Sequence, residues 1–225
     1  MRITYGTLVK AIDKDDGTDL LIHTNECLSE ILKRRCVSQI EVGYDDGRRI
    51  SIIQRRKIYA ILHDISDHTG YDPESAKQIM KNEHMMRVGE YDHFSLSNCS
   101  MSTAREFINT LMDYCLREGI ILTDTGLLRT DDIDTYLIQC IKYKKCCICG
   151  RYADIHHVDA IGMGNNRCKV NDSDREIMAL CRNHHSALHN MGNSKFMRMY
   201  AVYGIVRKRV EEYVVFSPSG FRYSN

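Results

Sequence analysis

The sequence predicts an α+β protein of two domains, the second of which is organised around bound metal. Short β-branched runs fill roughly the first fifty residues, and apolar residues then recur at helical spacing. Six of the ten cysteines and five of the ten histidines fall between residues 140 and 189. With 225 residues, the chain is long enough for one large or two small domains.

Bulk composition excludes several classes of protein. A hydrophobic content of 43% leaves room for a core, and there is no run of about eighteen apolar residues that would span a membrane. The start, "MRITYGTLVK", lacks the apolar core and cleavage site of a signal peptide. We therefore expect a cytoplasmic protein with no membrane partner. Its cysteines are then metal ligands or buried side chains rather than disulfides.

Residues 3–53 are predicted to be rich in strands. The runs "ITYGTLVKAI", "DLLIHT" and "SQIEVGY" are β-branched, and "DDG" at 45–47 is typical of a hairpin turn before "RRISII". A helix, "ECLSEILKRR" (26–35), is expected to interrupt these strands.

Three helices are predicted to follow. In the first, apolar residues recur at i, i+3, i+4 and i+7 from Ile58. The second, "DPESAKQIMKNEHMM", has Asp72 as its N-cap and a proline at its first position. The third, "STAREFINTLMDYCLREG", has a capping box of Thr103 with Glu106 and ends at Gly119.

A polar, glycine-containing stretch, "TDTGLLRTDDIDT" (123–135), precedes a change in charge. Residues 1–141 carry 17 Lys/Arg against 23 Asp/Glu, whereas residues 142–225 carry 14 against 7. We therefore predict domains at 1–125 and 141–225, joined by a linker and short helix at 126–140. A basic carboxy-terminal third is typical of polyanion-binding modules, although a solvated charged surface would look the same.

The cysteine-rich region contains two pairs of metal-ligand residues with matched spacing. Cys146 and Cys149 in "CCICG" form a C-x-x-C knuckle, and Cys181 and His184 are again separated by two residues. Four such ligands predict a closed, structural Cys3His zinc site. The alternative is a cluster of buried thiols.

Two further histidines are left unused by this zinc site. His185 and His189 are spaced i, i+4 and would project from one helix face, while His184 would lie about 100° away. With His156 from "DIHHVDAIGMGNNR" they make three ligands and leave open positions, as catalytic metals require. His157 is then available as a general base. A second structural zinc with all four histidines, or ordinary core histidines, are the alternatives.

The combination "CxxCG … IHHVDAIGMG … LCRNHHSALH" resembles the zinc-stapled HNH (ββα-metal) endonucleases, and is most similar to those of phages of Gram-positive hosts. The resemblance covers about residues 140–205. It implies a β-hairpin carrying His156 as ligand and His157 as base, with His185 and His189 on a helix. The implied reaction is phosphodiester hydrolysis with one divalent ion, Mg2+ or Mn2+, beside the structural Zn2+.

Two features depart from that family pattern. The family's middle asparagine precedes the "LC", where this chain reads "DSDREIMALC", with Glu176 or a neighbour instead. Asn165, Asn166 and Asn171 stay open as substitutes. Moreover, adjacent residues on a regular strand point to opposite faces, so either the hairpin is irregular at the histidine pair or one of their roles is misassigned.

Basic residues around the histidines are candidate phosphate contacts. Each alone is equally well a solvated charge, but together they suit the basic carboxy-terminal domain. The candidates are Arg167, Arg175, Arg182, Arg207, Lys208 and Arg209.

The amino-terminal domain shows no catalytic motif. Residues 48–122 are similar to the phage Orf/NinB recombination mediators in "RRISIIQRRKIYAILHDIS" and the later helix, with Tyr59 where tryptophan is usual. That resemblance implies a single-strand-DNA-binding module, dimeric, that works with single-strand-binding protein. Basic clusters at 33–35, 48–49 and 55–57 fit nucleic acid, or else solvated helix faces.

We therefore expect a metal-dependent DNA endonuclease, encoded by a phage or prophage and acting on recombination or replication intermediates in the bacterial cytoplasm. Its expected partner is single-stranded or branched DNA. The competing expectation is a non-catalytic recombination mediator in which the HNH-like domain is only a zinc-stabilised DNA-binding module.

Overall fold

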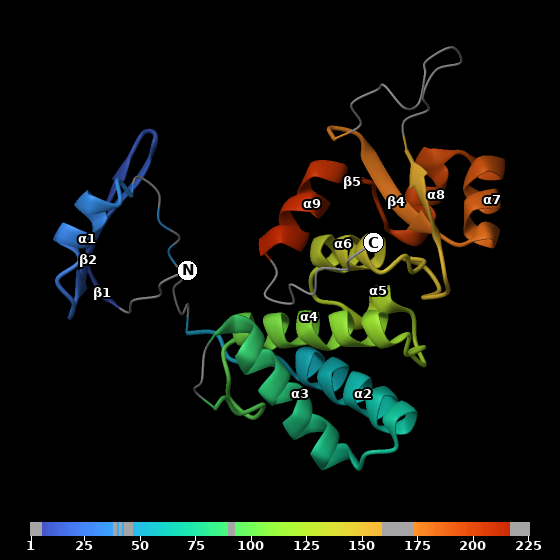
Figure 1. Cartoon of the computed structure of the whole chain (residues 1–225), viewed down its shortest axis with the longest axis horizontal. Helices are drawn as coiled ribbons and strands as arrows, with labels where there is room; N and C mark the ends of the chain where they lie inside the picture. Colours follow the sequence, from blue (N-terminus) through green and yellow to red (C-terminus); the bar gives the residue numbers. More distant parts are fainter. Residues whose placement is uncertain are drawn as a thin grey trace. The chain divides into compact units, whose positions relative to one another are not determined.

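The computed structural model describes residues 6–37, 40, 42, 47–89, 93–158 and 173–216. The chain divides into two compact units, Met1–Tyr44 and Asp45–Asn225. Figure 1 labels their elements.

The first unit contains a two-stranded antiparallel hairpin and one short helix. Strand β1 (Gly6–Lys14) pairs with β2 (Gly17–Thr24), with an irregularity in register between Leu8 and Lys10, and α1 spans Ser29–Arg34. None of its described residues is buried. The strand predicted at 3–12 is confirmed from Gly6 onward, residues 3–5 lying outside the described residues, and the strand predicted at 19–24 and the helix are confirmed. The expected strand at 38–44 and the turn at 45–47 fall mostly outside the described residues.

Three helices open the second unit: α2 (Ile52–Thr69), α3 (Pro73–Val88) and α4 (Met101–Glu118). Ser51 and Gln54 form a capping box for α2, and Asp72 caps α3 as predicted. The N-cap of α4 is Ser100, so the predicted box at Thr103 is wrong. No strand forms in "RRISII", since α2 has already begun at Ile52.

Apolar faces of these helices build the core. Ile58, Ile61 and Leu62 of α2 are buried at the spacing that the sequence predicted. In Figure 1, α2 and α3 lie against α4, whose Phe107 and Leu111 have no exposed surface. Gly119 ends α4 in the left-handed conformation, a position for which glycine carries no steric penalty.

The rest of the unit surrounds a small sheet. Helices α5 (Gly126–Arg129) and α6 (Ile133–Lys142) lead to strands β3 (Asp154–His157), β4 (Glu176–Leu180) and β5 (Ile205–Val206), antiparallel in the order β3-β4-β5. Three further helices are α7 (Arg182–Met191), α8 (Asn193–Tyr200) and α9 (Arg207–Phe216). In Figure 1, α7 and α8 lie on one side of this sheet and α9 on the other.

The division into units differs from the predicted domain boundary at 126–140. Helix α6, expected as a linker, is central to the core, because Tyr136, Leu137 and Cys140 are almost fully buried. One continuous cluster of buried side chains joins α2 and α4 to the sheet. Buried charge reinforces the junction, since Asp113 of α4 pairs with both Arg87 and Lys142. The helices and the cysteine-rich region therefore share one core.

Within the described part of the chain, no helix has the length and apolar character needed to cross a membrane.

Candidate metal centres

The two predicted halves of the Cys3His set meet beside the sheet. The knuckle around Cys146 is closed by a hydrogen bond from the Gly150 amide to the Cys146 carbonyl, 2.8 Å, with Gly150 at φ 69°. The amide of Cys147 donates to Ala179 of β4 at 3.1 Å. This contact holds the knuckle next to Cys181, which directly follows β4.

Four potential ligand atoms converge at this point, all within 4.8 Å of one another. The Sγ atoms of Cys149 and Cys181 lie 3.7 Å apart, and His184 Nδ1 lies 3.2 Å from Cys181 Sγ and 3.4 Å from Cys146 Sγ. Sulfurs that each stand about 2.3 Å from one tetrahedral zinc ion are about 3.8 Å apart. The donor set and its spacing therefore fit zinc.

The thiols of Cys146 and Cys181 differ in their acid–base state. Burial raises the pKa of Cys146 to about 12. Burial also raises the pKa of Cys181, but the backbone amides of His184 and Asn183 and the neighbouring thiols outweigh it and leave that pKa below its usual value. At neutral pH a bound cation would hold both sulfurs as thiolates, the form that binds metal.

The second set consists of histidines from a strand and a helix. His156 Nδ1 lies 2.8 Å from His185 Nε2, which lies 3.2 Å from His189 Nε2. His156 comes from β3, whereas His185 and His189 are one turn apart on α7, as their spacing predicted. The three rings meet edge to face, with centroids 4.5 to 5.3 Å apart. Three nitrogens thus face one point.

The chemistry of this set suits a divalent ion with open positions. Burial, together with the nearby histidines, lowers the pKa of His156 to about 4, so its ring is neutral and able to ligate above that pH. His189 is exposed and the other two rings are half-buried, so solvent reaches the set. Three protein ligands beside solvent is the arrangement that leaves room for water and substrate.

His157 belongs to neither set. The ladder between β3 and β4 is regular from Asp154 to His157, and the amide of Val158 continues it by donating to Glu176 at 2.9 Å. The irregularity considered from the sequence is therefore absent over residues 154–157. Because strand residues alternate, His157 projects from the opposite face to His156.

Asn193 is a residue that the sequence reasoning missed. Its Nδ2 donates to the carbonyl oxygen of Val158 at 2.8 Å, directly after His157, and it lies at the first position of α8. The contact ties the end of β3 to the helix pair. Asn165, Asn166 and Asn171, the candidates considered from the sequence, lie outside the described residues. The contact spans 35 positions, so no local pattern could have revealed it.

The predicted phosphate contacts occupy different surroundings. Arg182 begins α7, three and seven residues before His185 and His189, and so shares their face. The carbonyl groups of Arg175 and Ser173 accept hydrogen bonds from the amides of Arg207 and Lys208. The side chains of Arg207 and Arg209 are both in ion pairs. Arg167 lies outside the described residues. The pairs are Arg207 with Glu211 and Arg209 with Asp134.

Comparison with known proteins gives one family. The model of the family described as "Putative HNHc nuclease" matches residues 22–214. No curated protein and no solved structure matches the chain.

Proposed function

Since the chain belongs to the HNHc nuclease family, we propose that it is a metal-dependent endonuclease that cleaves DNA at the set formed by His156, His185 and His189. The observation that carries this proposal is the convergence of three ring nitrogens, from β3 and α7, beside solvent. Strands β3 and β4 followed by α7 supply the order of elements that a ββα-metal site requires.

The divalent ion, Mg2+ or Mn2+, would supply charge for the phosphorane-like transition state and the leaving 3′ oxygen. His157 removes the proton from the attacking water in this proposal. It is adjacent to His156 and is the last residue of β3, so this role requires the bound phosphate to extend past the end of the strand to the face opposite His156. Arg182 binds a phosphate oxygen from the face of α7.

Several residues of α2 support DNA binding away from this centre. Residues 47–63, which lead into α2 and form its first two thirds, carry five Lys/Arg and no Asp/Glu. Arg56 and Tyr59 are exposed one helical turn apart, and Tyr59 offers a ring on which an unpaired base can stack. We propose that this basic surface of α2 holds single-stranded or branched DNA from phage recombination, as Orf/NinB-type mediators do. Lys57, which pairs with Asp131, is not available for it.

A cleavage assay tests the proposed activity. Labelled single-stranded, duplex and branched DNA are incubated with the protein in Mg2+, Mn2+ or EDTA. We expect cleavage that requires the divalent ion and is lost when His185 and His189 are both replaced by alanine. A matched variant with His68→Ala and His93→Ala, two exposed histidines outside the proposed DNA-binding residues, should cleave normally. If none of the substrates is cleaved in a metal-dependent way, the proposed nuclease activity is wrong.

The regular strand at His157 favours one competitor, a mediator that binds DNA without cutting it. If this competitor is correct, a gel shift shows DNA binding in both Mg2+ and EDTA. The cleavage assay then leaves the DNA substrate uncut under every condition. The double histidine variant would then bind DNA as well as the native protein.

Asn193 gives a separate prediction about positioning. Asn193→Ala removes the hydrogen bond to Val158 and frees the end of β3, so we expect kcat to fall by about 10- to 100-fold with KM little changed. Metal content by mass spectrometry should stay native. Asn190→Ala, an exposed residue at the end of α7, is the control. Equal kcat in both variants would remove Asn193 from the site.

A further inference from the structure

We infer that the Cys3His centre is also a site of oxidative modification, at which a peroxide joins Cys149 to Cys181 as a disulfide and releases the zinc. The inference rests on the proposed zinc, and goes beyond the nuclease activity. It is drawn from a cavity beside the centre, from the exposure of one thiol and from a short distance between two sulfurs.

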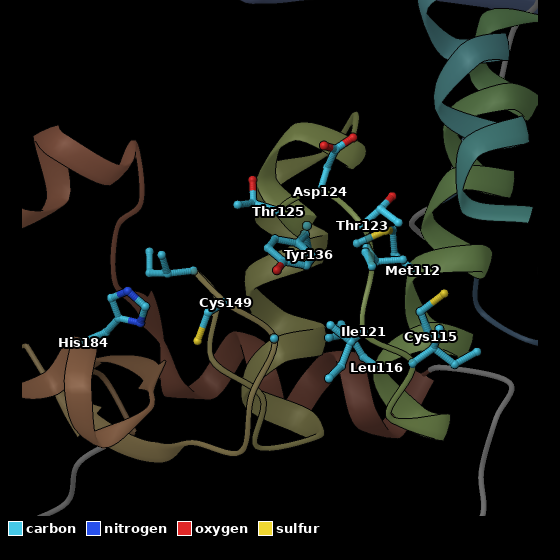
Figure 2. A pocket seen from close by; sticks show the side chains of 15 residues that line it. Met112, Cys115, Leu116, Ile121, Thr123, Asp124, Thr125, Tyr136, Cys149 and His184 are labelled. Carbon is cyan, nitrogen blue, oxygen red and sulfur yellow. The ribbon is translucent and has the colours of Figure 1, made fainter. Parts of the chain in front are cut away.

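The cavity, of about 330 Å3, lies between the loop at 120–126 and the cysteine knuckle. Two of the four ligand residues, Cys149 and His184, form part of its wall. Figure 2 shows them on one side, with Cys115 and Leu116 on the opposite side and Tyr136 between. The cavity is partly open to solvent, so a molecule as small as hydrogen peroxide can reach the ligands from this side.

Among the three cysteines of the centre, Cys149 is the most exposed residue. It is half-buried, whereas Cys146 has no exposed surface and Cys181 is 9% exposed. Its sulfur lies 3.7 Å from that of Cys181, so a change in side-chain rotation of either residue can bring the two within bonding distance. Cys149 is therefore the first target and Cys181 the resolving partner.

The chemistry balances with a peroxide as the oxidant. The Cys149 thiolate attacks one peroxide oxygen, the O–O bond breaks, hydroxide leaves, and a sulfenic acid remains on Cys149. The Cys181 thiolate then attacks that sulfur, the S–S bond forms, and a second hydroxide leaves. Two electrons pass from the sulfurs to the peroxide, and solvent protons convert both hydroxides to water. Zinc loses two of its four ligands and dissociates.

Release of zinc should affect the position of the histidine set through α7. Cys181 is the residue at the N-terminal cap of α7, and His184 lies in its first turn, immediately before His185. Both anchors of this helix end belong to the zinc centre. Oxidation therefore frees the start of the helix that carries His185 and His189, and cleavage should stop until a thiol reductant and zinc are supplied.

The test uses the full-length, zinc-loaded protein treated with hydrogen peroxide. A colorimetric chelator follows zinc release, and peptide mass spectrometry maps disulfides. We expect zinc release together with a Cys149–Cys181 disulfide, both reversed by dithiothreitol with added Zn2+. Cys149→His retains four ligands but lacks the reactive sulfur. Its zinc should be released at about one tenth of the native rate or more slowly. Cys115→Ala, on the opposite wall of the cavity, should behave as native.

The outcomes separate this inference from the proposed activity. If the protein is isolated without zinc, the inference is wrong, and metal-dependent cleavage can still be measured. Retention of zinc under peroxide, or a disulfide between any other pair, would overturn it with the nuclease untouched. Equal rates of release from native protein and Cys149→His would place the oxidation elsewhere.

Discussion

Replacing His157 by alanine should lower the rate of DNA cleavage by about 10²- to 10⁴-fold, the usual contribution of a general base. The side chain lies outside both metal sets, so zinc and the divalent ion should bind the variant as they bind the native protein. Single-turnover cleavage measures the rate, and mass spectrometry under native conditions measures the metal content of the variant beside that of the native protein. The fall should be in kcat, because the base acts only in the chemical step.

The matched control for His157 is Ile155→Ala, two residues earlier on the same strand and, by alternation, on the same face. Added imidazole should restore part of the activity of His157→Ala and none of that of the double variant at His185 and His189. Cleavage by His157→Ala at the native rate would remove this residue from the mechanism. The base would then have to be sought elsewhere, with the metal set unaffected.

Replacing Cys146 by alanine should have the largest effect on stability. Zinc binding to sites of this type is worth about 10 to 16 kcal/mol, comparable with the whole stability of a domain. We expect the variant to bind no zinc and to lose hydrogen-exchange protection in β4 and α7. Helices α2 and α4 pack directly on one another, so protection should fall less there than in β4 and α7.

Cys147→Ala provides the control for this loss. Cys147 is the adjacent residue and as deeply buried, at 1% exposed, but its sulfur is not among the converging ligand atoms. Its replacement should leave zinc in place and cost only the packing of one small side chain. Loss of zinc from both variants would mean that the knuckle needs its buried thiols for packing, and that the ligand set is misassigned.

The sequence was sufficient to predict which cysteines and histidines lie close together, because local geometry decides how residues at these spacings are arranged. A C-x-x-C turn brings two thiols together, and positions i and i+4 of a helix share a face whatever surrounds them. For the same reason the periodic apolar residues of α2 were predicted as core, and Ile58 and Ile61 are fully buried.

What the sequence did not predict depends on contacts between distant segments. The stretch at 123–135 is polar, yet Tyr136 and Gln139 after it are buried. The Tyr136 hydroxyl donates to the carbonyl of Cys147 in the knuckle, and Gln139 Nε2 donates to the carbonyl of Asn109 in α4. Polarity along the chain therefore does not indicate which of these residues pack into the shared core. Asn193 was missed for a related reason, since its partner Val158 lies far away in the chain.

Helix α7 places His184 and His185, two neighbours, toward two different ligand sets. Both sets depend on the same rotational phase of the helix, so one inserted or deleted residue between Cys181 and His185 would turn the histidines by about 100° and dismantle both together. The length of this segment is therefore constrained, whereas the identity of its residues that do not bind metal is not. Relatives of this protein should vary at the exposed Asn183 and Ser186, while the number of residues from Cys181 to His189 stays constant.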